Sequence, residues 1–355
     1  MTYNGTIDDA YAGYIISMAV WLSAAYVAMS SIRWAHGRLS IELVAYYLMA
    51  VCIAQGIEAL VIEYVQSVRS IVDAYINVDQ RTLHRIHRLY GIGASLDVAG
   101  ARFSPVLLLV THLAYNLDED ELNYKMWLYV AAFVSMLVLG SIIARTTYVG
   151  AVMSAAYIFI HPKTWKTTIS IKGISRFATI LGVIAVAVVT CTYFYNHDAS
   201  FHYWLRFAFE GFFNYFERGE YYLASTNKLE TMYVFPDNAK TWIIGDGYFS
   251  NPYWSDYTYT YINQNIRGFY METDVGYLRF IFYFGVIGLL AFMLFMYIVY
   301  VTCGKLMPDR KLFFFFVMMT NFTIWLKVAT DIFCFMAVFI CLGNMLMNQQ
   351  ETIEE

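Results

Sequence analysis

Two carboxylates stand directly before a long apolar stretch toward the end of the chain. Glu272 and Asp274 precede the apolar residues 275–301, and Arg279 lies about one helical turn inside that stretch. A carboxylate at such a position can act as a general base that takes a proton from a hydroxyl group. It can also cap the first turn of a helix, whose first amides lack partners within the helix. Glu272 and Asp274 are therefore the candidate catalytic residues, and a capping role stays open for Asp274.

A cluster of arginines precedes the third apolar stretch. Arg81, Arg85 and Arg88 fall at positions i, i+4 and i+7, so they line one face of a helix. Guanidinium groups bind phosphate through paired hydrogen bonds, which favours a site for a lipid diphosphate at the membrane boundary. The alternative is an amphipathic helix that lies on anionic lipid headgroups. Arg85 and Arg88 are the candidate ligands of this cluster.

Two further arginines lie at the ends of apolar stretches. Arg102 comes just before Ser104-Pro105, a pair that is typical of a helix cap and first turn. Arg145 separates the fourth apolar stretch from the fifth and has no aspartate or glutamate near it in sequence. A charge at either place is costly in lipid and normally faces the protein interior or water. For Arg145 the alternative is a side chain that extends to the membrane surface.

The polar segment 195–273 is rich in tyrosine and tryptophan. These side chains combine a flat apolar face with a hydrogen-bonding edge, a combination that suits sugar rings. An interfacial aromatic belt or a small loop core is the alternative for each single residue. The turn Gly245-Asp246-Gly247 in this segment is too short for a nucleotide-binding loop. The candidate glycan contacts are Trp242, Tyr248, Tyr253, Trp254 and Tyr270.

The composition places the chain in a membrane. It has 355 residues, of which 59% are hydrophobic and only 14% are charged. A soluble domain with so few charges would aggregate, so an integral membrane protein is expected. Five cysteines lie in or beside apolar stretches without a metal-binding spacing, and we expect neither a metal site nor a cofactor. The net charge of −4 gives no reason to expect a nucleic-acid partner.

The apolar stretches predict an all-α fold, a polytopic transmembrane bundle of about nine spans with a large external loop between spans six and seven. A stretch of roughly 20 apolar residues can cross a bilayer core of about 30 Å. The predicted spans are 11–32, 40–65, about 97–116, 126–144, 147–160, 177–194 and 275–301, and a hydrophobic pair within 312–347. Lys327 and Asp331 mark the middle of that pair, and a single long helix with an i, i+4 ion pair is the alternative.

Basic residues in the short loops set the predicted orientation. The turns 33–38, 163–176 and 305–311, and the turn at Lys125, fall on one side of the membrane if there are nine spans. Short loops with such basic residues stay in the cytoplasm. The N-terminus and the long polar loop are then outside, and the C-terminus is cytoplasmic. The predicted segments are N-terminal spans in 1–65, an arginine-rich external segment 66–103, four spans in 104–194, the external loop 195–273, and C-terminal spans in 274–355.

Taken in order, these residues resemble the motifs of the Wzy-type O-antigen polymerase and O-antigen ligase family. The resemblance covers about residues 85–300, and its specificity lies in the order of four short motifs. The matching segments are Arg88-Leu89-Tyr90-Gly91 for an external R-x-x-G element, Ala144-Arg145-Thr146-Thr147 for a helix junction, Gly245-Asp246-Gly247 for a turn of the long loop, and Asp274-Val275-Gly276-Tyr277-Leu278-Arg279 with Gly285 and Gly288 for its close.

The resemblance implies a metal-independent, inverting glycosyltransferase of the multi-spanning type in the bacterial inner membrane. Its donor and acceptor would be undecaprenyl-diphosphate-linked oligosaccharides, the repeat units of a lipopolysaccharide O-antigen or a capsule, joined at the periplasmic face. A chain-length regulator is a further candidate partner. Carried over to this sequence, the resemblance marks Arg88 and Arg145 as diphosphate ligands, with Arg102, Arg267 and Arg279 as further candidates.

The closing motif distinguishes two activities within that family. Ligases commonly place a histidine there, whereas this chain has Glu272-Thr273-Asp274, which favours a polymerase. A ligase that transfers a finished glycan to an acceptor remains one alternative. A flippase for lipid-linked glycans is another, because it would also need interior arginines, although it has no use for an aromatic loop closed by carboxylates. The predicted nine spans are fewer than most members of the family have.

Overall fold

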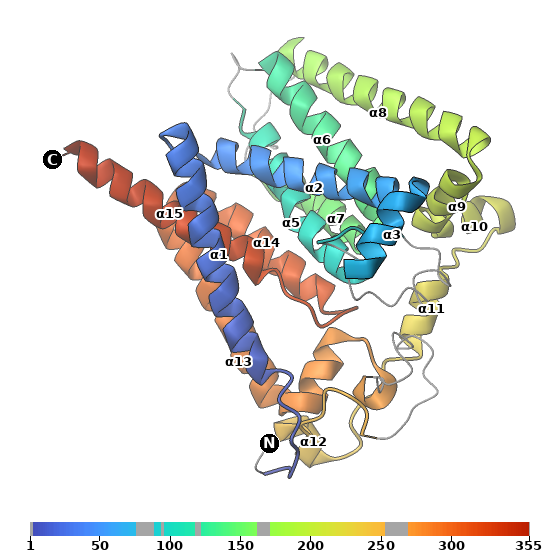
Figure 1. The fold of residues 1–355 in the computed structure, drawn as a ribbon, viewed down its shortest axis with the longest axis vertical. Coiled ribbons are helices and arrows are strands. Elements are labelled where there is room, and N and C mark those ends of the chain that lie inside the picture. The colour runs from blue at the N-terminus through green and yellow to red at the C-terminus, as the bar shows by residue number, and fades with distance from the viewer. Residues whose placement is uncertain are drawn as a thin grey trace. The chain divides into compact units, whose positions relative to one another are not determined.

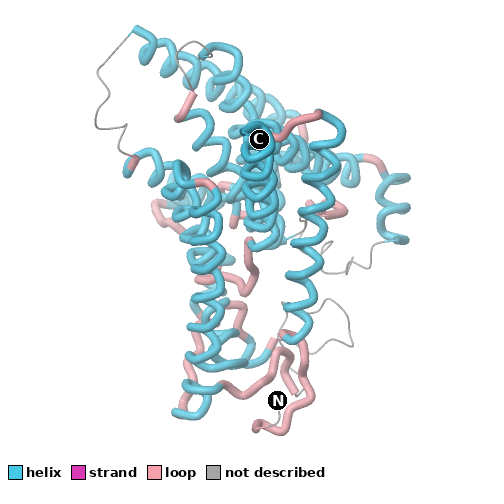
Figure 2. The backbone as a smooth tube through the Cα atoms, turned by 90° about the vertical axis from the view of Figure 1, so that its left-hand side faces the viewer, coloured by secondary structure: helices cyan, strands magenta, loops and turns pink. Residues whose placement is uncertain are grey.

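The computed structural model describes residues 3–75, 89–93, 96–117, 122–161, 171–252 and 269–354. The regular structure of these residues is helical, and an isolated β-bridge joins Ser250 and Phe269 (Figures 1 and 2). Six helices are long and apolar enough to cross a membrane: α1 (Ala12–His36), α2 (Ile41–Tyr64), α5 (Leu96–Tyr115), α6 (Leu122–Ile143), α8 (Ile171–His197) and α13 (Gly276–Leu306). The predicted all-α fold with membrane-spanning helices is thereby confirmed.

The three other predicted spans fall on helices outside this group of six. These are α7 (Thr147–Ile160), α14 (Lys311–Ile324) and α15 (Phe333–Glu354). The stretch 312–347 thus forms two helices, because residues 325–332 interrupt it. The Asp331 carboxylate accepts a hydrogen bond of 2.8 Å from the Phe333 amide and so satisfies the first amide of α15. The single long helix with a Lys327–Asp331 pair is therefore wrong, while nine spans and their orientation stay predictions.

The chain forms two compact units that do not follow its linear order. Unit 1 draws on Met1–Ile41 and Ala224–Glu355, and unit 2 on Glu42–Asn77 and Leu83–Leu223. The predicted external loop 195–273 is therefore shared between the units, with its first part in unit 2. That part is largely helical, since it contains the end of α8, then α9 (Ala199–Ala208) and α10 (Glu210–Arg218).

Small residues hold α5 and α7 together at the centre of unit 2. A Cβ atom added to Gly150 would lie 2.5 Å from the Ser104 Cα atom, so only glycine allows this approach. The Ser104 hydroxyl donates to the Thr146 carbonyl at 3.1 Å and accepts from the Gly150 amide at 3.2 Å. Ser104 was expected as a helix cap, but it lies inside α5 and joins the two helices instead. This contact fixes the junction that carries Arg145.

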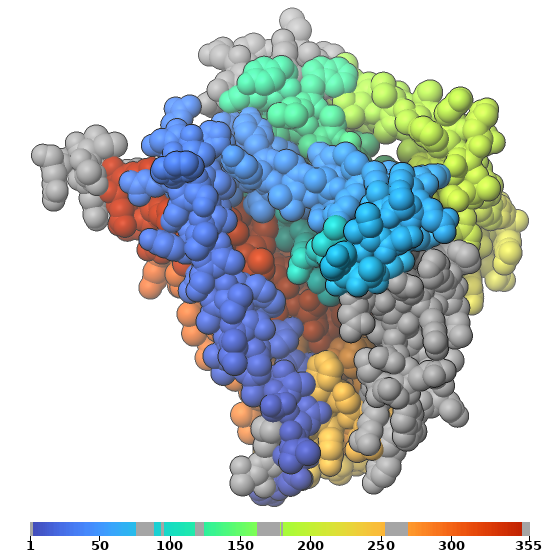
Figure 3. Space-filling model, in the orientation of Figure 1, coloured from blue at the N-terminus to red at the C-terminus, as the bar shows by residue number. Residues whose placement is uncertain are grey.

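In unit 1, α15 packs against both α1 and α13 (Figure 1). Much of the apolar surface of α1 is exposed, and Figure 3 shows this helix in blue along the face toward the viewer. Ile15, Val20 and Val27 are 76%, 57% and 62% exposed, as expected for a helix that faces lipid. Two short helices, α11 (Ala224–Glu230) and α12 (Ala239–Ile244), complete the described part of the polar loop in this unit.

The apolar stretch 275–301 is not one continuous helix, since α13 reverses direction at Gly285. Gly285 has φ 71° and ψ −176°, a conformation that only glycine adopts readily. Phe280 and Phe292 are twelve residues apart and would be separated by about 18 Å along a straight helix. Their ring centroids are 5.3 Å apart instead. The first part of α13, which carries Arg279, therefore lies back against the second.

The reversal is stabilised by the turn Gly245-Asp246-Gly247. The break leaves the carbonyls of Phe282 and Tyr283 without helical partners, and they accept hydrogen bonds from the Asp246 and Gly247 amides at 2.6 and 3.2 Å. A Cβ atom on Gly245 would lie 2.5 Å from the Tyr283 carbonyl group. The turn that resembles a family motif therefore contacts α13 through backbone atoms of both segments.

Candidate functional site

Arg279 lies at the centre of a buried aromatic cluster in unit 1. Its residue is 9% exposed, and its guanidinium carbon is 3.6 Å from the ring centroid of Phe269 and 4.5 Å from that of Phe249. Stacking on two rings holds the planar guanidinium and leaves its N–H groups directed outward along the plane. In the described part of the chain, no carboxylate forms an ion pair with Arg279. The site therefore holds a buried positive charge.

The N-terminal segment closes one side of this site. The Asp8 carboxylate accepts hydrogen bonds from the amides of Phe249 and Ser250 at 2.8 and 3.3 Å, and the Tyr283 hydroxyl donates to the Asp8 carbonyl at 2.6 Å. Tyr11, 7% exposed, packs edge-on against Tyr283 with ring centroids 4.7 Å apart. Tyr11 thereby covers this side of the site around Arg279.

Asp246 lies in the turn Gly245-Asp246-Gly247, and its carboxylate has both hydrogen-bond and ion-pair partners in unit 1. Its carboxylate accepts hydrogen bonds from Thr241 at 2.9 Å and Tyr270 at 3.2 Å, and it pairs with Lys240 at 3.2 Å. Burial, and then the negative charge of Asp246, raise the pKa of Tyr270 to about 12. Asp246 thus anchors the turn, and its charge is already neutralised.

The predicted catalytic carboxylates lie at the entry to α13. Glu272 is exposed and has φ 54°, as does Met271 before it, so the chain turns sharply here. Asp274 is half-buried. Val275, rather than Asp274, holds the N-cap position of α13, without a capping side chain. The capping role left open for Asp274 is therefore not seen, and a catalytic role for either residue stays a prediction.

Two predicted glycan contacts belong to a small loop core. The Trp242 indole donates to the Pro236 carbonyl at 2.9 Å and stacks on Phe235, with ring centroids 6.3 Å apart. Tyr270 packs edge-on against Phe282 and lies 5.3 Å from the ring of Tyr248. This is the loop-core alternative for Trp242 and Tyr270. Whether any of these rings binds sugar stays a prediction, and Tyr253 and Trp254 lie outside the described residues.

In unit 2, Arg145 has a partner that is distant in sequence. Its Nη2 atom lies 2.5 Å from the Glu210 carboxylate, its Nε donates to the Phe207 carbonyl at 2.9 Å, and its guanidinium stacks on the Phe207 ring at 4.0 Å. The side chain is 11% exposed. Arg145 thus faces the protein interior, as expected, although Glu210 neutralises its charge. Snorkelling to the membrane surface is not what this arrangement shows.

Replacing Glu210 by Gln is expected to destabilise the protein by about 3 kcal/mol, because removal of one partner of a buried pair leaves a buried charge. The measurement is thermal unfolding in detergent. The double variant Arg145→Gln/Glu210→Gln should recover part of the loss. The matched control is Glu217→Gln in the Arg206–Glu217 pair, whose side chains are 35% and 43% exposed. This replacement should lower the stability of the protein by less than about 1 kcal/mol. Additive effects of the two buried changes would contradict a coupled pair.

Arg102 contacts the segment that follows the predicted R-x-x-G motif. Its guanidinium donates to the Gly93 carbonyl, and the Gly93 amide donates to the Gln55 side chain at 3.2 Å. The neighbouring Ile92 amide donates to Glu58 at 3.2 Å. The motif residue Leu89 is buried in the same apolar cluster as Ala144, the neighbour of Arg145. Arg85, Arg88 and Arg267 lie outside the described residues.

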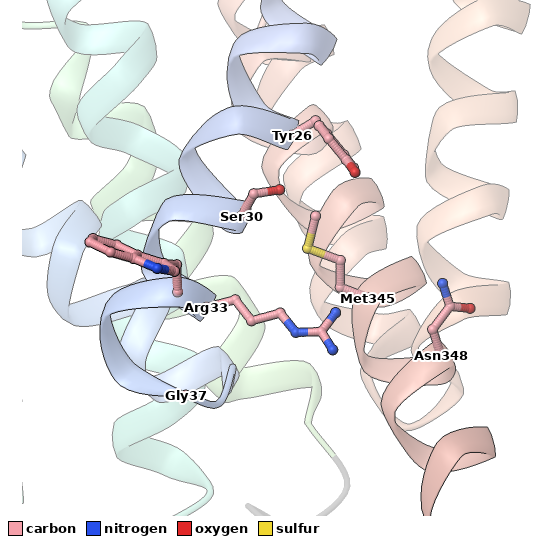
Figure 4. A pocket seen from close by; sticks show the side chains of 7 residues that line it. Tyr26, Ser30, Arg33, Gly37, Met345 and Asn348 are labelled. Carbon is pink, nitrogen blue, oxygen red and sulfur yellow. The ribbon is translucent and has the colours of Figure 1, made fainter.

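A pocket of about 440 Å³ at the far end of α1 contains none of the predicted site residues (Figure 4). Its one charged residue is Arg33, in the last turn of α1, where a positive charge stabilises the carboxyl end of a helix. Its lining residues are Tyr26, Ser30, Arg33, Trp34, Gly37, Met345 and Asn348.

Several groups around Arg279 were not predicted from the sequence. Phe249 and Phe269 lie among many aromatic residues of the polar loop, and Tyr11 lies more than 260 residues away along the chain. Asp331 interacts with Tyr14 on α1, whereas the sequence predicts it only at the middle of the terminal pair or as a partner of Lys327. An aspartate within a hydrophobic segment was the available signal, because such a charge is costly unless it has a role.

The described residues define a helical membrane protein with a buried, aromatic-stacked arginine in one unit and a half-buried Arg–Glu pair in the other. Comparisons with protein-family models, curated proteins and solved structures found no match for this chain.

Proposed function

We propose that the chain is a glycosyltransferase that polymerises lipid-linked oligosaccharide repeat units, as the resemblance to O-antigen polymerases implies. The observation that supports this best is Arg279, a 9% exposed arginine stacked between two rings with no carboxylate paired to it among the described residues. A buried charge without a counter-ion is costly, so its retention favours an anionic ligand. A diphosphate of a polyprenyl carrier fits the planar guanidinium.

In this proposal Arg279 acts on the leaving group. The oligosaccharide donor is bound through its undecaprenyl diphosphate, and its anomeric carbon is attacked by a hydroxyl of a second lipid-linked repeat unit. Negative charge builds on the diphosphate as the glycosidic bond to phosphate breaks. A guanidinium already held in place stabilises that charge without reorganisation, and such stabilisation is often the largest single catalytic contribution. The resemblance implies that the transfer inverts the anomeric centre and needs no metal.

The test is a reaction with purified components. Protein in detergent or nanodiscs is mixed with undecaprenyl-diphosphate-linked repeat units, without nucleotide sugar, and products are separated by size. A ladder of lengthening lipid-linked glycans is expected. If well-folded protein with its native repeat unit forms no ladder, the polymerase proposal is wrong. A ligase would instead move a preformed glycan onto an added acceptor, such as lipid A core, without forming a ladder.

A lipid-linked glycan flippase is the second candidate, favoured by the interruptions in unit 1. The break at Gly285 in α13 and the break at 325–332 between α14 and α15 resemble the discontinuous helices that bind substrate in transporters. In proteoliposomes, a flippase would move a labelled lipid-linked oligosaccharide between leaflets without forming a new glycosidic bond. The same preparation can be used for the ladder assay, so one experiment separates the two functions.

A further inference from the structure

We propose that Asp331 is the general base of this site, in place of Glu272 or Asp274. The inference rests on the proposed glycosyl transfer. It starts from the break at 325–332, which packs against the beginning of α13. The Tyr277 amide donates to the Trp325 carbonyl at 3.2 Å, and the Trp325 ring lies 4.9 Å from that of Phe280, the neighbour of Arg279. The break thus brings Asp331 into the same part of unit 1 as Arg279.

Tyr14 connects the aspartate with the arginine. Its phenol interacts electrostatically with both Asp331 and Arg279. Its ring lies 6.2 Å from Phe292, which stacks on Trp325 with centroids 5.2 Å apart. Three chain segments therefore meet here: the start of α1, the reversed part of α13 and the break before α15. They bring a carboxylate, a phenol and a guanidinium to one cluster.

The second observation is that buried polar atoms in this cluster lack partners. Asp331 Oδ1 accepts from the Phe333 amide, its Oδ2 is buried, and the Tyr14 phenol is the other hydrogen-bond partner of this carboxylate. Two further buried groups have no hydrogen-bond partner among the described residues: the Tyr11 hydroxyl, and Asn321 Nδ2, which donates no hydrogen bond although its residue is fully buried. The Asn321 Oδ1 accepts from the Ile332 amide at 3.1 Å, so this amide group also borders the break. Buried polar groups are normally satisfied, and a group of unsatisfied ones favours a polar ligand.

This arrangement suits a hydroxyl acceptor. Residues 327–331 are half-buried, so the carboxylate lies under a partly accessible loop. Asp331 Oδ2 can accept the acceptor's O–H, and Asn321 Nδ2 and the Tyr11 hydroxyl can donate to other sugar oxygens. Glu272, by contrast, is exposed at the sharp turn before α13. A base in a less solvated place takes a proton more readily, because burial disfavours its charged form.

The step balances as follows. The acceptor hydroxyl gives its proton to Asp331 Oδ2, and its oxygen forms a bond to the donor's anomeric carbon. The bond from that carbon to the phosphate oxygen breaks, and its electron pair stays on the undecaprenyl diphosphate, whose charge Arg279 offsets. The proton on Asp331 then passes to water. The products are a lengthened lipid-linked glycan, undecaprenyl diphosphate and one proton.

The test uses Asp331→Asn, which separates catalysis from capping. Asparagine caps a helix about as well as aspartate, so α15 should be retained, but its amide cannot accept the proton. We expect a ladder-forming rate about 10²–10⁴-fold below that of the wild type, the usual contribution of a general base. The melting temperature and the binding of added undecaprenyl diphosphate should stay near those of the wild type. The matched control is Asp309→Asn, at an exposed aspartate of the same unit, which should keep the wild-type rate. Glu272→Gln and Asp274→Asn test the competing assignment: loss of the ladder in either of them, with Asp331→Asn still active, would overturn the inference.

The outcomes are distinct. If wild-type protein forms no ladder, the proposed function fails and this inference fails with it. If wild-type protein forms a ladder and Asp331→Asn forms it at a similar rate, the polymerase proposal stands and Asp331 is only a helix cap. If Asp331→Asn unfolds, Asp331→Ser and Asp331→Glu decide the matter. Serine also caps but cannot act as a base and should abolish the ladder, whereas glutamate should keep part of it. A ladder formed by Asp331→Ser but not by Asp331→Glu would overturn the inference.

Discussion

Replacing Arg279 by lysine is expected to reduce ladder formation by about 10²–10³-fold, the range found when one stabilising donor is removed from a developing anion. Lysine keeps the charge but loses the planar group that Phe249 and Phe269 hold at 4.5 and 3.6 Å. An ammonium group is a compact point charge that does not form paired hydrogen bonds with phosphate. The rate, more than the fold, should therefore change.

The measurement is the initial rate of ladder formation together with the melting temperature in detergent. Arg33→Lys is the matched control, since Arg33 is an exposed arginine of the same unit at the far end of α1. It should leave the rate unchanged. Adding undecaprenyl diphosphate should inhibit the wild type, and it should inhibit Arg279→Lys more weakly. A normal rate in Arg279→Lys would remove Arg279 from the diphosphate site.

The apolar stretches were predictable because local composition decides where a helix can cross a bilayer. Each predicted span overlaps a helix, from α1 near the N-terminus to α15 at the C-terminus. A run of apolar residues with few charges has no other way to satisfy its backbone in lipid. The ends were less predictable. The polar loop was expected from 195, yet α9 and α10 continue the helical chain there and bury Trp204 and Ala208.

Pairs between distant residues could not be predicted in this way. Arg145 has no acidic residue near it in sequence, but Glu210, 65 positions later, forms its ion pair. The same holds for Asp8, which binds the amides of Phe249 and Ser250. Such contacts depend on how helices pack, and a single sequence carries no periodic signal for them. The arginines were thus recognised as costly charges, while their partners were not.

The reversal of α13 escaped prediction for a related reason. Residues 275–301 read as a continuous apolar span because Gly285 alone is a weak signal, since an isolated glycine in a helical pattern is usually tolerated. What makes it a break is the turn at Gly245–Gly247, which lies some 40 residues earlier and supplies the amides for the two freed carbonyls. The position of Arg279 follows from that contact.

Replacing Gly285 by alanine is expected to prevent correct folding of unit 1. An added Cβ atom would lie 2.1 Å from the Ile243 carbonyl oxygen, a backbone atom that cannot move aside cheaply. The backbone conformation of φ 71° and ψ −176° adds a cost of about 1–3 kcal/mol for a non-glycine residue. The overlap comes on top of this strain, so the loss should exceed that of strain alone. We expect little monodisperse protein on size-exclusion chromatography and a strongly lowered melting temperature.

Gly37→Ala separates strain from overlap, because Gly37 has φ 70° but open space around its Cα. It should cost only about 1–2 kcal/mol, the penalty of the left-handed conformation, and yield well-folded protein. A wild-type melting temperature for Gly285→Ala would mean that α13 does not reverse at this residue. Arg279 would then lie on a continuous helix, about 18 Å of helix axis would separate Phe280 from Phe292, and the cluster around Arg279 and Asp331 would lose its structural basis.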